Sequence, residues 1–413
     1  MNLNLERRNF FGALWHGAFL ALGTALTQPT TVIAAFVADL TGSTIWVGGL
    51  STVLTVAGAL PQLFVARLVE PRPRKMPFLM LAIYLRVISW GALAGLIYLI
   101  GDSHPNLLAW ALVGLLAVFY AGGGLGGVPY TDIIGKVIPQ QQRGAFFGGK
   151  EALAGPLSVG AALLARQVIA DVAYPINYAL LFGLAALSLL TASLGFWLIR
   201  EPPRADAGVP VSSWREYAAQ LGQTARHLEV LIGVQLLTGF SLMALPFYVV
   251  YARQELDAPP GAVGWFLLAQ VLGGVLANLV WAPLVDRGGS RRMLAACAVT
   301  SALTPLLAIL LGRLGWPGLL PVIFLGGAAF NGRKVGFNSA LLELAPAAER
   351  PTYSALNAVL ILPVAFLSLI AGALLQHWSY QSLFIVAAAC IGIGALLTQR
   401  LPERAPQMVE IHK

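Results

Sequence analysis

Charged residues are scarce in this chain of 413 residues. Asp, Glu, Lys and Arg make up 11% of it, whereas soluble globular domains carry about 25%. The hydrophobic fraction is 58% and the mean hydropathy is +0.76. So few charges cannot cover the apolar surface of a water-soluble chain, and this composition also excludes a disordered chain. The sequence therefore predicts a protein whose main solvent is lipid.

Cysteine and catalytic motifs are equally scarce. The two cysteines, Cys297 and Cys390, lie in separate apolar runs and form neither a metal-binding spacing nor a disulfide framework. We find no Walker sequence, nucleophile motif or His/Cys/Asp cluster, so no ATP, metal or other cofactor and no enzymatic activity are expected. Gly122, Gly124 and Gly127 fit G-x-G-x-x-G, but no strand precedes them. Inside an apolar run such glycines favour close helix packing.

Long apolar runs are what the chain has in abundance. A helix that crosses a bilayer needs about 17–25 mostly apolar residues. Twelve runs of roughly this length predict an all-α membrane protein with twelve transmembrane helices in two pseudo-symmetric six-helix bundles. The predicted spans are Phe10–Val37, Trp46–Val65, Met76–Ile100, Asn106–Tyr130, Gly144–Leu164, Tyr174–Ile199, Val230–Val250, Val263–Val285, Leu294–Leu311, Gly318–Leu342, Ser354–Leu375 and Ser382–Thr398.

The positive charge predicts the orientation in the membrane. The net charge is +8, and with the N-terminus inside only Arg166, Arg253 and Arg313 fall on the outer side. Positive loops stay in the cytoplasm, so we expect a multi-pass inner-membrane protein with both termini cytoplasmic. The cytoplasmic loops then account for the basic pI, and no nucleic-acid partner is expected. The longest polar stretch predicts a boundary between the bundles: residues 1–199 form the first, 200–228 a cytoplasmic linker, and 229–413 the second.

The two halves repeat each other. At an offset of 207 residues, Pro139 aligns with Pro346, Arg143 with Arg350 and Pro156 with Pro363; at an offset of 216, Gly48 aligns with Gly264 and Glu70 with Asp286. The order of the spans is kept, so the halves are parallel repeats about an axis along the membrane normal. Two-bundle transporters have this arrangement, with the binding site at the midplane between the halves.

The loop after the eighth span carries a family resemblance. Asp286-Arg287-Gly288-Gly289-Ser290-Arg291-Arg292 resembles the acidic-basic-glycine-basic loop motif of the major facilitator superfamily, and Glu70-Pro71-Arg72-Pro73-Arg74-Lys75 is a degenerate copy that lacks the glycine. The resemblance implies a secondary transporter that rocks two bundles about a central site, usually as a monomer. Ala154–Gly160 is similar to the glycine-proline motif of the antiporter branch, which implies efflux.

Charges near the predicted cytoplasmic ends are candidates for a gate. A carboxylate there can pair with a guanidinium group of the other bundle in one state and separate from it in the other. The alternative is that these charges only anchor the topology. The predicted gate residues are Glu70, Arg74, Asp286, Arg287, Arg291, Arg143 and Arg350.

Charges inside the predicted spans are costly and therefore mark candidate substrate sites. Four bases outnumber Glu151, the one clearly intramembrane acid, and this excess favours an anionic substrate. The alternative is that structural ion pairs or snorkelling neutralise the bases. The predicted substrate-binding residues are the bases Arg86, Lys150, Arg333 and Lys334 and the amides Gln28, Gln235, Asn331 and Asn338.

Coupling to a proton needs a titratable group whose access alternates between the two sides. Glu151 is the leading candidate, followed by Asp132, Glu343 and His16, although a lone histidine among apolar residues is more often a packing group. Asp39, at the outer end of the first span, is expected to be solvated.

The sequence thus predicts an ion-coupled, proton-linked secondary active transporter that works by alternating access and exports a small amphiphilic or anionic compound. Uptake or exchange of an organic anion is the main alternative. A lipid flippase or a non-transporting sensor of the same fold remains the third.

Overall fold

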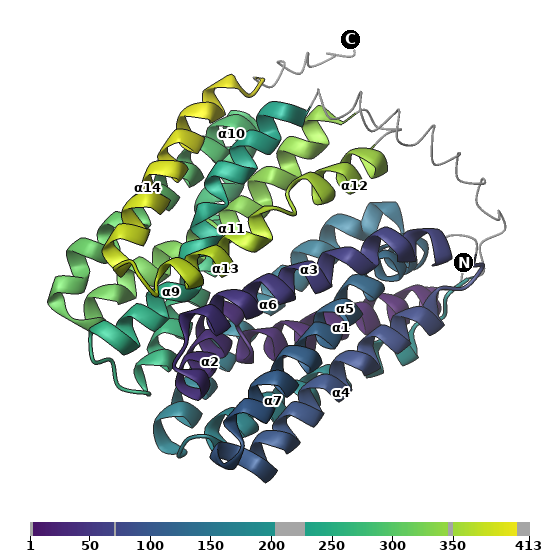
Figure 1. Ribbon diagram of the computed structural model, residues 1–413. Helices are drawn as coiled ribbons and strands as arrows, with labels where there is room; N and C mark the ends of the chain where they lie inside the picture. The colour runs from purple at the N-terminus through teal and green to yellow at the C-terminus, as the bar shows by residue number, and fades with distance from the viewer. Residues whose placement is uncertain (1–2, 70–71, 203–227, 346–349, 403–413) are drawn as a thin grey trace.

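The computed structural model describes residues 3–69, 72–202, 228–345 and 350–402, and these residues form helices and short connections (Figure 1). The first half contains α1 (Leu3–Leu26), a π-helical turn η1 (Pro29–Ile33), α2 (Ala34–Thr41), α3 (Thr44–Val69), α4 (Met76–Ile100), α5 (Pro105–Val137), α6 (Arg143–Asp171) and α7 (Ile176–Leu198). The second half contains α9 (Phe240–Glu255), α10 (Ala262–Leu311), α11 (Leu319–Leu344), α12 (Arg350–Leu360), α13 (Val364–Leu374) and α14 (Tyr380–Leu397).

The predicted fold class is confirmed. Ten helical segments in the described chain are long and apolar enough to span a membrane, and one of these, Leu228–Glu255, includes α9. The 50-residue α10 holds two crossings, because Gly289 breaks the helix with φ 70° and ψ 174°. With α10 counted twice and α11 added, the segments correspond to the twelve predicted spans. The predicted linker, residues 200–228, falls almost entirely outside the described chain.

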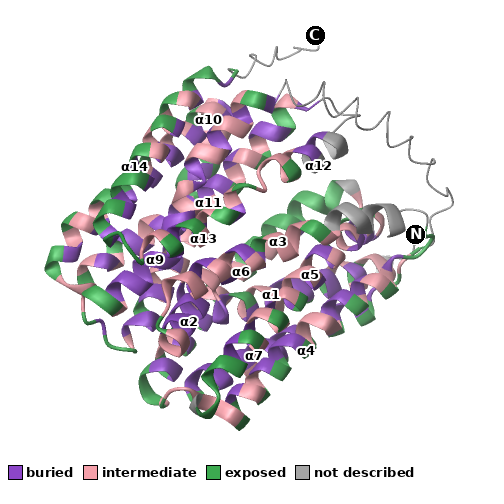
Figure 2. Cartoon of the chain, in the orientation of Figure 1, coloured by how far each residue is buried: buried purple, intermediate pink, exposed green. Residues whose placement is uncertain are grey.

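The helices form two bundles that meet along two seams. In the first bundle α4 packs on α5 and α7, and α1 packs on α6 and α7; in the second, α10 packs on α11 and α14. The bundles touch where α3 meets α13 and where α6 meets α10 (Figure 1). Large aromatic side chains such as Phe36, Trp90 and Phe182 are buried inside the first bundle, whereas Leu99 and Trp197 are exposed on it. Exposed and buried stretches alternate along α7 and α14 (Figure 2), as expected when lipid surrounds a bundle.

Two spans that the sequence predicts as continuous are broken by proline. The first span stops at Gln28, where Pro29 opens the π-helical turn and the Gln28 carbonyl accepts from the amides of Thr31 and Ile33. The eleventh span is interrupted at residues 361–363, so that α12 and α13 are separate helices on either side of Pro363. Proline lacks an N–H and crowds the preceding turn. Such breaks are tolerated in a membrane where they line a cavity.

Glycine brings the bundles into backbone contact at one end. We call the end where α1 begins and α14 ends the terminal end, and the opposite end the distal end. On the distal half of the seam between α3 and α13, a Cβ on Gly48 would lie 2.0 Å from the Ser368 carbonyl oxygen, and one on Gly372 would lie 2.3 Å from that of Thr44. The Thr44 hydroxyl donates to the Gly372 carbonyl at 2.8 Å. We call this contact the distal seam.

Further contacts extend the closure at the distal end. The Thr52 hydroxyl donates to the Ala365 carbonyl at 2.7 Å across the same two helices. On the other seam, a Cβ on Gly264 of α10 would lie 2.4 Å from Cα of Arg166 in α6. Small residues let helix backbones approach in lipid, where no hydrophobic force drives helices together. The distal end is therefore closed by close packing.

Gly48→Ala is expected to open the distal seam. The added methyl group meets backbone, and overpacking of this kind costs about 1–3 kcal/mol, which corresponds to roughly a 5- to 150-fold shift between two conformations. Distances between spin labels on the distal ends of α3 and α13 should lengthen. The matched control is Gly49→Ala, whose Cβ would make only an ordinary 3.6 Å contact with Leu369. An unchanged distance distribution in Gly48→Ala would contradict the role of the seam.

Candidate functional site

One ion pair links the two bundles at the distal end. Arg253 of α9 donates from Nη2 to Oδ1 of Asp39 in α2 at 2.8 Å, and both side chains are largely buried, with 19% and 18% exposed. Arg253 also donates from Nη1 to the Ala258 carbonyl at 2.6 Å, which holds the guanidinium group in place. Among the ion pairs that join described residues, this pair alone crosses between the bundles. The expectation that Asp39 is solvated is therefore wrong.

A cavity of about 620 Å³ lies between the bundles. Both broken spans contribute to it, through Gln28, Pro29 and Thr30 on one side and Ile361 and Leu362 on the other. Most of its wall is apolar. The remaining polar side chains in its lining are Ser51, Thr55, Tyr120, Gln235, Arg333 and Ser368. We call it the larger cavity.

Arg333 is the cation in the wall of the larger cavity. It is 9% exposed and lies on α11. Its Nη1 donates to the hydroxyl of Thr238, its Nη2 to the Gln235 carbonyl at 3.3 Å, and its guanidinium carbon lies 5.0 Å from the centre of the Phe337 ring. None of the described carboxylates pairs with it. Gln235 is itself held by Asn357, whose Oδ1 accepts from Gln235 Nε2 at 2.6 Å.

A second cavity, of about 280 Å³, adjoins the first and shares Gln28 and Phe330 with it. We call it the smaller cavity. Glu151 of α6 and Lys334 of α11 line it from opposite bundles. Asn331 also lines it, and its amide donates to Asn278 Oδ1 at 2.8 Å. The smaller cavity therefore combines an acid, a base and amides, next to a larger cavity with an apolar wall.

Five of the eight predicted substrate-binding residues line a cavity, and the other three lie elsewhere. Gln28, Gln235, Arg333, Asn331 and Lys334 line one or both cavities; Arg86, Lys150 and Asn338 do not appear in either lining.

The three that lie elsewhere have local surroundings of their own. The guanidinium carbon of Arg86 lies 4.5 Å from the centre of the Phe119 ring, and its Nε has no hydrogen-bond partner among the described residues. The side chain of Lys150 packs along Gly17, and its ammonium lies 5.9 Å from the centre of the Tyr130 ring. Asn338 is exposed, one turn closer to the terminal end than Lys334.

The candidates for proton coupling are spread over the molecule. Glu151 lines the smaller cavity. His16 is buried inside the first bundle, with Nδ1 3.2 Å from the Ala192 carbonyl and its ring 4.4 Å from that of Phe196. Glu343 lies near the terminal end, where it accepts from the backbone and hydroxyl of Ser290 just after the break in α10. Of the four candidates, only Glu151 lines one of the two cavities.

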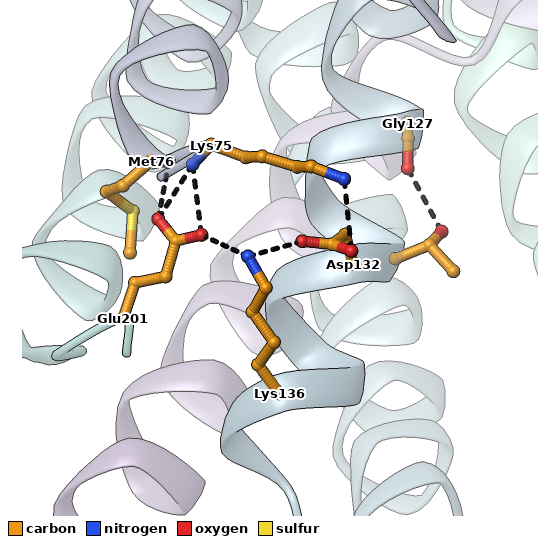
Figure 3. Close-up of polar contacts among 7 residues, drawn as sticks. Lys75, Met76, Gly127, Asp132, Lys136 and Glu201 are labelled. Carbon is orange, nitrogen blue, oxygen red and sulfur yellow. Dashed lines mark hydrogen bonds and ion pairs between the residues drawn. The ribbon is translucent and has the colours of Figure 1, made fainter. Parts of the chain in front are cut away.

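Asp132, the fourth candidate, belongs to a network of charges at the terminal end of the first bundle (Figure 3). Its carboxylate lies 3.0 Å from Nζ of Lys75 and 2.7 Å from Nζ of Lys136. Lys136 also pairs with Glu201 at 2.8 Å, and Glu201 accepts from the backbone amides of Lys75 and Met76 at the start of α4. Two acids and two bases thus balance within one bundle. We call them the terminal network.

Four of the predicted gate residues, Arg74, Arg143, Asp286 and Arg287, form no ion pair across the bundles with the described residues. Arg74, Asp286 and Arg287 are exposed. Arg143 donates to the carbonyls of Gly135 and Ile138 in its own bundle. Arg291 lies just beyond the break in α10. Glu70 and the side chain of Arg350 lie outside the described residues.

The comparisons with known proteins agree with this architecture. Residues 230–410 match the family model described as Major Facilitator Superfamily. No curated protein matches the chain by sequence. A bacterial homologue of the iron transporter ferroportin in an inward-facing state matches with a TM-score of 0.70 at 14% identity, over 97% of this chain and 99% of that chain.

Two other solved structures extend the comparison. The xylose transporter XylE from E. coli, in an inward open conformation, matches with a TM-score of 0.66 at 15% identity, over 98% of this chain and 97% of that chain. A bacterial homologue of ferroportin in an outward-facing state with soaked iron matches with a TM-score of 0.58 at 15% identity, over 97% of this chain and 99% of that chain.

The chain is a multi-pass membrane protein with the fold of these transporters, and its second half matches the family model. The predicted resemblance to the major facilitator superfamily is confirmed.

Sequence reasoning missed the distal ion pair and the role of Glu201. A signal for the first was present: Asp39 and Arg253 end the first and seventh spans, which are equivalent in the two repeats and therefore face each other across the pseudo-twofold axis. For Glu201 the signal was weaker, because its partners Lys75 and Lys136 come from two other helices.

Asp132→Asn is expected to lower the stability of the protein rather than its coupling to protons. The change removes the carboxylate between Lys75 and Lys136, so that Lys75 loses its carboxylate partner and Lys136 keeps only Glu201, which should cost about 1–3 kcal/mol. The apparent melting temperature in detergent should fall, while proton-driven flux per folded molecule is retained. Asp257→Asn, in an exposed loop, is the control. An unchanged melting temperature with lost proton-driven flux would assign Asp132 to coupling instead.

Proposed function

We propose that this protein is a proton-coupled secondary active transporter of small amphiphilic anions, captured in its inward-facing conformation. It works by alternating access, as a monomer, in the inner membrane with both termini in the cytoplasm. The observation that carries the substrate class is Arg333, a buried cation that pairs with none of the described carboxylates and lies in the wall of an apolar cavity between the bundles.

The assignment of the inward-facing conformation rests on three observations. The hydrogen bonds of Thr44, Thr52 and Gln270 and the ion pair of Asp39 with Arg253 join the two bundles, and all of them lie in the distal half. The bias of Lys and Arg supports a cytoplasmic location for the terminal end, which makes the distal end the outer one. The TM-score of 0.70 with an inward-facing ferroportin homologue exceeds the 0.58 with an outward-facing one.

The substrate class follows from the cost of burying Arg333. A buried guanidinium group needs acceptors for its five donors and a counter-charge. Thr238 and the Gln235 carbonyl supply acceptors but no charge. An anionic group of the substrate in the larger cavity would provide that charge, while the apolar wall would receive an apolar body. This combination favours an amphiphilic anion over a sugar or a cation.

The smaller cavity supports coupling through Glu151. When ionised, Glu151 attracts Lys334 of the other bundle and repels an anion in the adjoining cavity. When protonated, it releases Lys334 to the substrate. A proton and an anion therefore favour each other's binding, and an inward proton gradient would then drive uptake of the anion together with the proton.

Export is the second candidate. It is favoured by the glycine-proline segment of α6, where Gly155 lies against Val275 of the other bundle. A Cβ added to Gly155 would lie 3.3 Å from Cγ1 of Val275. The segment thus sits on the seam that must move during transport. Flux measured in proteoliposomes with a proton gradient of either sign distinguishes cotransport from exchange.

Arg333→Gln is expected to weaken the binding of organic anions by about 10- to 100-fold, because it removes a charge-assisted hydrogen bond donor at a buried position. Thermal shifts of the purified protein with a panel of anionic, cationic and neutral compounds measure this effect. The control is Arg313→Gln, which removes the same charge from an exposed position. Equal stabilisation by anions in Arg333→Gln and in the control would refute the proposed substrate class.

Glu151→Gln is expected to abolish coupling while leaving anion binding intact. The amide mimics the protonated acid, so anion affinity should be high and no longer rise as the pH falls. Proton-driven accumulation in proteoliposomes should be lost, whereas exchange of labelled for unlabelled substrate should persist. Glu255→Gln, at an exposed position of the distal end, serves as the control. Gradient-driven accumulation that survives in Glu151→Gln would exclude this residue as the coupling acid.

A further inference from the structure

A third cavity lies at the distal end, away from the transport site. Its volume is about 340 Å³, and it shares no lining residue with the two central cavities. Arg166 and Asp171 of α6 form one wall, from the first bundle. Ala262 and Trp265 of α10, together with Trp316 from the turn that follows, form the other wall, from the second bundle. We call it the distal pocket.

One side of the distal pocket is positive. Arg166 stacks on Trp265, with its guanidinium carbon 4.3 Å from the ring centre. Its Nε is buried without a hydrogen-bond partner among the described residues, and no described carboxylate pairs with it. The pocket also includes Gly261 and Ala262, the start of the long α10, where the helix dipole adds partial positive charge. Two independent features thus favour an anionic group here.

The opposite charge is present in the same lining. Asp171 is the last residue of α6, where the helix dipole is negative, so the carboxylate gains nothing from its own helix. It accepts one hydrogen bond, from Nε2 of Gln167 at 3.1 Å, and forms no ion pair with Arg166. A cation and a carboxylate therefore line one pocket without neutralising each other.

We propose that the distal pocket binds a zwitterion that carries an ammonium and a phosphate or carboxylate group. The anionic group would accept from Arg166, the ammonium would donate to Asp171, and the connecting carbons would lie against Trp265 and Trp316. Aromatic faces also attract an ammonium directly. A simple anion or a simple cation satisfies only one of the two charges.

The depth of the pocket in the membrane favours a phosphoethanolamine group as the zwitterion that binds there. Trp46 and Trp110, at the distal ends of α3 and α5, contact each other with ring centres 4.9 Å apart. With Trp265 and Trp316 they place four tryptophans at this end, and tryptophan concentrates at the level of lipid headgroups. The ligand is thus a headgroup of this type or the same group free in solution.

Binding in the distal pocket would hold the distal end closed. The pocket has walls from both bundles, and its two helices touch where Gly264 meets the backbone of Arg166. Separation of α6 from α10 would divide it. A ligand that binds only the closed form shifts the population toward that form. The direction of this shift rests on the proposed alternating access, whereas the binding itself does not.

The test compares the purified full chain with three single variants: Arg166→Gln, Asp171→Asn and, as the control, Arg313→Gln. Phosphoethanolamine is added to protein in detergent, with ethanolamine and inorganic phosphate as single-charge probes, and the thermal shift is measured. In parallel, the protein is placed in nanodiscs of phosphatidylethanolamine or of phosphatidylglycerol, and spin labels report the distance between the distal ends of α6 and α10.

We expect phosphoethanolamine or phosphatidylethanolamine to stabilise the protein and its closed distal end, with an apparent affinity that falls at least about tenfold in Arg166→Gln and in Asp171→Asn. An effect of the lipid alone identifies a headgroup, and an effect of the free compound as well identifies a soluble ligand. Equal effects of phosphate or phosphatidylglycerol, or an unchanged response in both variants, would overturn the proposal. Stabilisation without any change in the distance distribution would retain the site but contradict its role in holding the distal end closed.

Discussion

Backbone contact between the bundles at the distal seam is the constraint on which the rest of the structure depends. In lipid, apolar side chains gain little by leaving one apolar surface for another, so helices associate through close packing and hydrogen bonds. Gly48 and Gly372 permit that packing, and the hydroxyls of Thr44 and Thr52 donate across it. Such a contact is tight yet made of few strong interactions, so it can separate and reform. Because it lies in the distal half, the cavities between the bundles are sealed from that end.

The charges are arranged so that each bundle can move as a unit. The terminal network of Lys75, Asp132, Lys136 and Glu201 neutralises four charges inside the first bundle and ties the end of α7 to the start of α4. Charges that pair within a bundle resist no relative motion. Only Asp39 and Arg253 pair across the bundles in the described chain, at the end that is closed. The predicted cytoplasmic gate would need its partners in the opposite conformation, where the terminal ends approach each other.

The sequence predicted the fold class and the spans, because both depend on composition or on spacing along the chain. It predicted the site less completely, because the face that a side chain occupies depends on how each helix is rotated. Spans that are apolar all round carry no such signal. Arg333 and Arg86 look alike in the sequence, yet the first lines the larger cavity and the second packs on Phe119 inside a bundle. The breaks at Pro29 and Pro363 were also missed, although proline is the expected cause.

The site departs from the symmetry of the fold, and this departure is informative. The repeat mates of Arg333 and Lys334 are Gly126 and Gly127, so the second bundle carries bases where the first carries glycines. The acid Glu151 faces the cavities from the first bundle. A substrate anion would therefore be held mainly by the second bundle, with the titratable group opposite it. Under the proposed alternating access the two bundles would separate at one end and then at the other, so the attraction between acid and base would change with the conformation. That dependence is what a coupled transporter requires to link proton binding to the movement of its substrate.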